Sequence, residues 1–192
     1  MNPYILILSI ILFQFFETLQ SKEKSNSFST ICSSHVHIEE DDFGRGTLMK
    51  TKPIRVADGF WISSSSVGDE KKLYVSLVFT GTSNYQINPT EVHEFSFDSS
   101  AGKIIVQMTP SEIKSPVSKT QITGGSEYIP LSTSNTTTYT LIYDLSEESF
   151  QYFKTNLLSS IRITSLSSVF PFKATRIAKL NLFRNTMACL EG

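Results

Sequence analysis

The sequence lacks the residue patterns by which many enzymes are recognised. Residues 124–128 read Gly-Gly-Ser-Glu-Tyr, so the second glycine of the Gly-x-Ser-x-Gly nucleophile elbow is missing. No phosphate-binding loop of the P-loop or dinucleotide kind is present either. These absences remove the usual support for a hydrolase or a nucleotide-dependent enzyme, and no catalytic or cofactor-binding residue is assigned.

A run long enough to span a membrane is also missing. Residues 4–16 are apolar except for Ser9 and Gln14, which makes about 13 residues where a membrane-spanning helix needs about 20. This length, followed by a polar stretch and the small residue Ser21, is typical of a secretory signal peptide. We predict a signal peptide over residues 1–21, a polar leader over 22–27 and a secreted or periplasmic protein that is not integral to the membrane; an uncleaved anchor is the alternative.

Cysteine is scarce, because the chain has only Cys32 and Cys189. In an oxidising compartment the two can pair, and a disulfide that closes so long a loop stabilises a fold by up to about 5 kcal/mol. Two separately buried thiols are the alternative, since pairing requires Cα atoms within about 7 Å. The sequence leaves both open.

The chain has almost no excess of charge of either sign, because the formal net charge is -1. The end of the chain is nevertheless basic: only Glu191 opposes Lys154, Arg162, Lys173, Arg176, Lys179 and Arg184 after residue 150. A basic patch can attract nucleic acid or anionic lipid. Here it lacks interleaved aromatic residues, so we interpret it as the solvated face of a helix and expect no nucleic-acid partner; contact with anionic lipid is the alternative.

What the sequence does contain is a series of short alternating and β-branched segments separated by turn residues. We predict one β-rich domain over residues 28–192, mainly β (α+β), as an antiparallel β-sandwich or half-barrel with two C-terminal helices. Strands are expected near residues 28–38, 47–51, 55–62, 72–79, 93–97, 103–109, 116–122, 127–131, 136–143 and 161–164. The polar runs 63–66 and 135–138 are suited to loop tips.

Two segments have helical spacing instead. Phe150, Phe153, Leu157 and Leu158 fall on one helix face, and Ser146 stands at the N-cap position, which predicts a helix near residues 146–158. A second apolar stripe at three- to four-residue spacing predicts a helix near residues 174–190.

Histidine supplies the sharpest local feature. His35 and His37 alternate with Glu39 beyond them, and alternate residues of a strand share a face, so the segment could hold a divalent metal with His93 as a further ligand. A His-x-His strand followed by an acid also resembles the cupin barrel, with Asp41 in the place of the acid, but the glycines that frame that motif are missing. A solvent-facing polar strand is the alternative.

Aromatic residues at Phe60 and Trp61 could present a surface to a sugar or to another protein. Trp61 is the only tryptophan of the chain. Core packing is the alternative explanation for both rings.

Several segments together resemble a loose group of small exported bacterial proteins of unknown function. These are the leader, the early Cys32, residues 41–47 with an Asp-x-Phe-Thr-Gly-like pattern, and residues 157–163, which lead through an Ile-Arg-Ile strand to the closing helix and Cys189. Gly44 stands where that pattern has threonine. The resemblance implies a β-rich fold with terminal helices, a cell-envelope location and no established activity.

The sequence thus favours an exported, non-enzymatic binding or structural module of the cell envelope that needs no cofactor. Its partner is open, with an envelope protein or a glycan as candidates. The alternative is a cupin-like metal-binding protein or enzyme that uses the His-x-His strand and a divalent metal.

Overall fold

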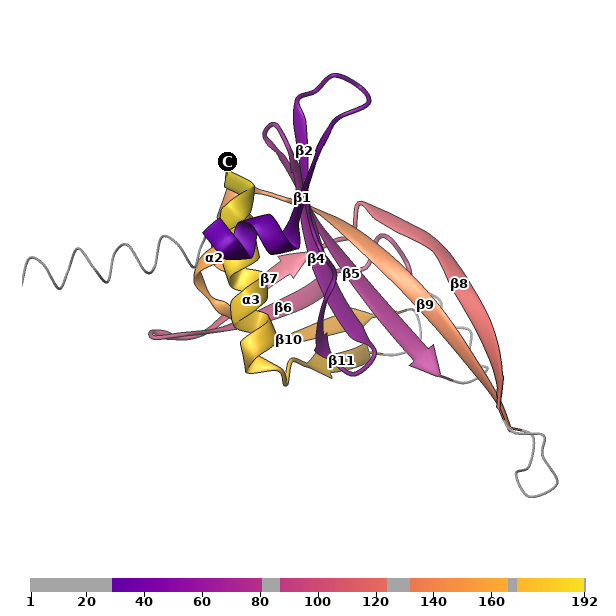
Figure 1. Cartoon of the computed structure of the whole chain (residues 1–192). Coiled ribbons are helices and arrows are strands. Elements are labelled where there is room, and N and C mark those ends of the chain that lie inside the picture. The colour runs from indigo at the N-terminus through magenta and orange to yellow at the C-terminus, as the bar shows by residue number, and fades with distance from the viewer. Residues whose placement is uncertain (1–28, 81–86, 124–131, 166–168, 192) are drawn as a thin grey trace, which may run out of the picture.

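The computed structural model describes residues 29–80, 87–123, 132–165 and 169–191. They form two antiparallel sheets and three α-helices, which confirms the predicted mainly β class and its sandwich-like architecture (Figure 1). The predicted signal peptide, the polar leader and the strand expected near 127–131 lie outside the described residues.

The larger sheet has seven strands in the order β1-β2-β4-β5-β9-β8, with β3 paired to β4. Neighbouring strands run antiparallel throughout. Its members are β1 (Val36–Glu40), β2 (Thr47–Thr51), β3 (Ile54–Ala57), β4 (Phe60–Val67), β5 (Glu70–Thr80), β8 (Glu112–Thr123) and β9 (Ser132–Leu145).

The smaller sheet has four strands in the order β11-β10-β6-β7. They are β6 (His93–Ser99), β7 (Gly102–Met108), β10 (Leu157–Thr164) and β11 (Val169–Lys173). The helices are residues 29–35, α2 (Glu147–Thr155) and α3 (Ile177–Ala188), which continues into a 3-10 turn at Cys189–Glu191.

The core lies between the two sheets and beneath the helices. Leu73, Val75 and Leu77 alternate along β5 and are fully buried on one face of the larger sheet, which we call the covered face. Phe95 of the smaller sheet packs edge-on against Tyr143, with ring centroids 5.1 Å apart. Side chains at the intervening positions of β5 point to the opposite face, the open face.

The polar run Ser63–Ser66 is not at a loop tip, as its composition suggested, but lies inside β4. Ser64 points to the covered face and is buried, and the Thr51 hydroxyl of β2 satisfies its polar groups: it accepts from the Ser64 backbone N–H (2.8 Å) and lies 3.3 Å from the side-chain oxygen. The run 135–138 likewise lies within β9. Cross-strand hydrogen bonding therefore turns two loop-like compositions into strand.

The single strand expected over residues 55–62 is wrong in its middle, because a turn at residues 58 and 59 divides it into β3 and β4. Gly59 has φ 68° and its carbonyl accepts a hydrogen bond from Val78 N–H at 2.8 Å. A Cβ atom at this position would stand 2.7 Å from the Val78 carbonyl oxygen. Glycine is required here by both backbone angle and space.

Helix α2 begins where its cap predicts and ends earlier than expected. The Ser146 side chain accepts from Ser149 N–H at 3.1 Å. Leu157 and Leu158 belong to β10 instead, because Leu158 pairs with Phe97 of the smaller sheet and is buried there. The prediction of helix up to residue 158 is wrong at its last turn.

The end of the chain also differs from the prediction. Residues 174–176 are not helical, and β11 before them was missed because Pro171 interrupts its pattern. Proline is tolerated there because β11 is an edge strand. Helix α3 then packs by Leu180, Phe183 and Met187.

Cys32 and Cys189, whose pairing the sequence left open, form a disulfide with Cα atoms 5.6 Å apart. Residues 29–35 are helical, so the prediction of strand over 28–38 is wrong in that part and holds only from Val36. The bridge joins this first helix to the end of α3, and the two lie side by side in Figure 1. No helix among the described residues is long and apolar enough to cross a membrane.

Candidate binding site on the open face of the larger sheet

A row of polar side chains crosses five strands of the open face. In the strand registers, each of these residues lies directly opposite the next one on the neighbouring strand. They are His37 on β1, Lys50 on β2, Ser65 on β4, Lys72 on β5 and Asp144 on β9. Neighbouring strands lie about 4.8 Å apart, so Lys50 and Lys72 are separated by about 10 Å at their Cα atoms, with Ser65 between them. The centre of the row is therefore positive and carries a hydroxyl.

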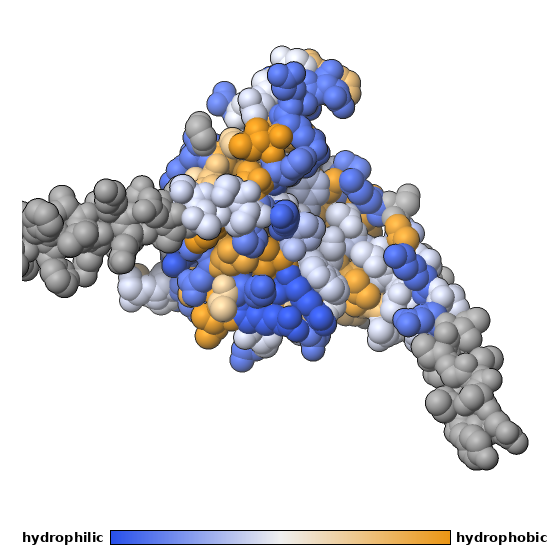
Figure 2. Space-filling view, viewed as in Figure 1, coloured by the Kyte–Doolittle hydropathy of each residue, from blue (hydrophilic) through white to orange (hydrophobic). Residues whose placement is uncertain are grey.

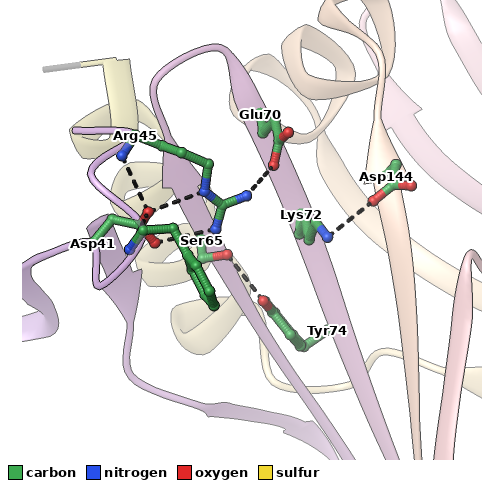
Figure 3. Close-up of polar contacts among 8 residues, drawn as sticks. Asp41, Arg45, Ser65, Glu70, Lys72, Tyr74 and Asp144 are labelled. Atoms are coloured by element: carbon green, nitrogen blue, oxygen red, sulfur yellow. Dashed lines mark hydrogen bonds and ion pairs between the residues drawn. The ribbon is translucent and has the colours of Figure 1, made fainter. Parts of the chain in front are cut away.

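A hollow of about 170 Å³ opens over the centre of this row. Its lining combines charge of both signs with two hydroxyls and two aliphatic side chains: Asp41, Arg45, Leu48, Lys50, Ser65, Val67, Glu70, Lys72 and Tyr74. Ser65, which is only 5% exposed, lies 3.1 Å by its Oγ from the Tyr74 hydroxyl (Figure 3). The two hydroxyls orient each other and leave lone pairs and one proton for a ligand.

One side of the hollow is held by a charged turn. The Asp41 carboxylate accepts from Arg45 Nε at 3.0 Å and from the backbone N–H of Phe43, and Arg45 also reaches Glu70 Oε2 at 3.1 Å (Figure 3). The Asp41 side chain keeps only 6% of its surface exposed. The hydrogen bond from Arg45 lowers the pKa of Asp41. Arg45 is therefore neutralised by two carboxylates and fixes the turn between β1 and β2.

The two lysines have looser partners. Lys50 Nζ lies 3.5 Å from Glu39 Oε2, and Lys72 Nζ lies 3.7 Å from Asp144 Oδ1. Exposed ion pairs of this length contribute little. Both ammonium groups can therefore turn to an anionic ligand at small cost.

Trp61 lies on the same face, because the odd-numbered residues of β4 alternate with Phe60, Ile62 and Ser64, which point to the covered face. Its ring is half-buried, and the Arg55 guanidinium lies over it, 5.3 Å from the centroid. Phe60, in contrast, is fully buried in the core. Of the two aromatics considered for a surface role, Trp61 lies on the open face four positions along β4 from Ser65, and Phe60 packs inside.

The three histidines proposed as metal ligands are placed apart. His35 ends the first helix and its Nδ1 lies 2.7 Å from Ser34 Oγ, while His37 on β1 contacts Glu39 at 2.8 Å on the open face. His93 is fully buried. The described residues hold no group of three or more His, Cys, Asp or Glu side chains arranged for a metal ion. The geometry does not favour the cupin-like hypothesis, which stays a prediction.

His93 has a structural role instead. Its Nδ1 lies 2.6 Å from the Tyr143 hydroxyl and its Nε2 lies 3.2 Å from the Thr164 carbonyl oxygen. A neutral ring that donates from Nε2 to the carbonyl and accepts at Nδ1 satisfies both contacts. Burial lowers the pKa of His93 and raises that of Tyr143, so both groups are held neutral between the sheets.

Comparisons with models of protein families, with curated proteins and with solved structures give no match for the chain. The functional argument therefore depends on the geometry of the open face. The resemblance to small exported bacterial proteins stays a prediction.

Sequence reasoning missed the central residues of the site. Lys50, Ser65, Lys72 and Tyr74 carry no motif, and they meet only because the registers of β2, β4 and β5 align them. The one available signal was the alternation of Lys72, Tyr74 and Ser76 with apolar residues, which shows a polar face without naming its neighbours.

Proposed function

We propose that this chain is an exported, non-enzymatic binding module whose open face binds an acidic glycan of the cell envelope. The observation that carries the proposal is the cross-strand row Lys50–Ser65–Lys72 at the bottom of a hollow. Two ammonium groups on either side of a hydroxyl match a carboxylate, because charge-assisted hydrogen bonds are stronger than neutral ones.

Hydroxyl groups and an aromatic ring support a sugar as the carrier of that carboxylate. The Ser65 and Tyr74 hydroxyls provide donors and acceptors within the hollow, as a polyhydroxylated ligand requires. Trp61 lies on the same face four positions along β4 from Ser65, and its half-buried ring, which has the Arg55 guanidinium over it, is placed to contact a neighbouring unit of a polymeric sugar. The fixed turn around Asp41 lowers the cost of ordering this side of the site.

Export is supported by the bridge between Cys32 and Cys189, since disulfides persist mainly in oxidising compartments. The predicted signal peptide over residues 1–21 agrees with such a compartment. The proposed location is the secreted fraction or the cell envelope.

The test is a binding titration of the purified protein with alginate, a polymer of uronic acids, and with dextran, a neutral glucose polymer. We expect binding to alginate that weakens with added salt, and none to dextran. Lys50→Gln and Lys72→Gln should each raise the Kd for alginate about tenfold or more, because each removes a charge-assisted hydrogen bond. Lys103→Gln, on the smaller sheet, is the matched control and should leave the Kd unchanged.

Three results would contradict the proposal. Equal binding of the two polymers would show that the lysines do not select the ligand. Turnover of a glycan that is lost on changing Asp41 or Glu70 would make the protein an enzyme. A stoichiometric metal ion in the native mass spectrum, lost in His37→Ala, would instead support the metal-binding alternative.

A further inference from the structure

We propose that two copies of this chain associate through strand β1, which would pair antiparallel with β1 of the second copy about a two-fold axis at Ile38. Among the described strands, β1 pairs only with β2 and forms one edge of the larger sheet. Figure 1 shows the β1–β2 hairpin projecting from the body, and Figure 2 shows its surface to be mostly hydrophilic. The free edge is thus accessible to another strand.

The edge strands β7, β8 and β11 carry proline, lysine or a register shift, which oppose strand pairing, whereas the polar side chains of the short strand β1 can pair with each other across a two-fold axis. Strand β8 contains Pro116 and a register shift between Lys114 and Val117, and β11 contains Pro171. Strand β7 carries a lysine at its start. Proline, lysine and bulges protect edges against association. Strand β1 has no proline, no lysine and no register shift.

The backbone of β1 fixes the register of such a pairing. Lys52 N–H donates to the His35 carbonyl at 2.8 Å, and Asp41 N–H donates to the Gly46 carbonyl at 3.0 Å. Hydrogen-bonded residues alternate along an antiparallel ladder, so the odd-numbered residues of β1 face β2. The N–H and C=O groups of residues 36, 38 and 40 therefore point to the free edge. Only a two-fold axis at Ile38 lets all three pair, residue 36 with 40 and 38 with itself.

The side chains agree with that register. His37 would stand opposite Glu39 of the second copy, and Glu39 opposite His37, in the closely spaced non-hydrogen-bonded pairs. Within one chain His37 Nε2 already lies 2.8 Å from Glu39 Oε1, so the imidazole and the carboxylate are complementary hydrogen-bonding groups. On the other face the two Ile38 side chains, each 64% exposed in the single chain, would cover each other. Because β1 is complementary to itself in this register, a second copy of the chain is the partner that fits its free edge.

The two-fold axis would stand perpendicular to the sheet, so both open faces would lie on the same side. Two ligand hollows on one surface would allow a polymer to bind both at once, with avidity above that of one site. A five-residue edge makes a small interface, and a reversible dimer is therefore expected.

The test is sedimentation equilibrium of the full chain over a wide concentration range. We expect a monomer–dimer equilibrium. Its dissociation constant should rise at least about tenfold in Ile38→Lys, which replaces the apolar contact with two positive charges that repel each other. Ile105→Lys, at an exposed isoleucine of edge strand β7, should leave it unchanged.

Charge exchange tests the register itself. His37→Glu and Glu39→His should each weaken the dimer, because like groups would face each other, and the double variant should restore it. Circular dichroism and the intact disulfide establish that each variant is folded. A chain that stays monomeric throughout, a dimer insensitive to Ile38→Lys, or a double variant no better than the single ones would overturn the proposal. Because none of these readouts involves a glycan, failure here and failure of the proposed function are separate results.

Discussion

The two faces of the larger sheet come from the same strands and differ in almost every property. On β5, Leu73 and Val75 are fully buried on the covered face, whereas Lys72 and Tyr74, one position away, line the hollow of the open face. Because side chains of a strand alternate, a shift of register by one residue would exchange the two faces. The covered face therefore fixes the register, and the register then assembles the site.

The comparison predicts that stability depends on the covered face and binding on the open face. The covered face is closed by the smaller sheet and by α3, whose buried residues include Leu180 and Phe183. The open face carries charges whose partners are long or exposed. Variants on the two faces should therefore separate into two classes, and the variants below are ordered by the size of their expected effect on stability.

The largest effect is expected at the bridge that ties the helices over the covered face. Replacing both Cys32 and Cys189 by serine should lower the free energy of unfolding by about 5 kcal/mol, since the loop it closes spans 157 positions. Urea unfolding followed by circular dichroism measures the change. Reduction of the unaltered chain is the control and should give a similar loss, while an unaltered midpoint in either sample would show that the bridge does not constrain the fold.

A pair of adjacent residues on β9 compares the faces directly. Leu141 is fully buried on the covered face, and Leu141→Ala should cost about 2–5 kcal/mol through lost burial and a cavity. Thr140 lies on the open face with its hydroxyl 3.2 Å from Ser76 Oγ, and Thr140→Ala should cost about 1 kcal/mol or less. Chemical denaturation of both variants measures the difference. Equal losses would mean that the two faces do not differ in their contribution to stability.

These differences explain how far the sequence could predict the fold. The strand at Thr47–Thr51 and the Ser146 cap depend on local alternation and local hydrogen bonds, and both were predicted correctly. The helix at 29–35 was predicted as strand, because the bridge to Cys189 that anchors it joins distant parts of the chain. Where tertiary contacts compete with local pattern, the tertiary contacts decide.

The site was less predictable than the fold for the same reason. Its central side chains come from three strands, and only the registers β2–β4 and β4–β5 place Lys50, Ser65 and Lys72 in one row. The histidines were prominent in the sequence, yet His93 is used in the core, where it lies against Tyr143. The histidines were predicted as a site from their residue type alone. The lysines form the candidate site because the strand registers bring them together.

The pH dependence of stability should follow the buried histidine. The pKa of His93 is lowered by burial, so the unfolded chain binds more protons than the folded chain at pH values below about 6.5. The contribution of His93 to the free energy of unfolding should be largest above that pH. It should decrease as the pH falls towards the folded-state pKa, by at most about 1.4 kcal/mol per pH unit. Unfolding titrations between neutral and mildly acidic pH measure this slope.

The control for that slope is the exposed histidine of β1. His93→Gln should remove the histidine contribution to the slope, whereas His37→Gln should retain it, because His37 is 66% exposed on the open face. A slope that persists in His93→Gln and disappears in His37→Gln would assign the proton-linked stability to the open face and contradict the prediction.

The smallest effect on stability, and the sharpest contrast with binding, is expected at Lys72. Its Nζ lies 3.7 Å from Asp144, and exposed pairs contribute about 0–1 kcal/mol, so Lys72→Gln should change the free energy of unfolding by about 0.5 kcal/mol or less. The same variant is expected to lose most binding to alginate, because only the Lys50 ammonium group would remain to bind the carboxylate of the polymer. Urea unfolding and titration of a single preparation measure both quantities. A variant that loses stability and binding together would show that the open face supports the fold as well as the ligand, because the two faces would then no longer be independent.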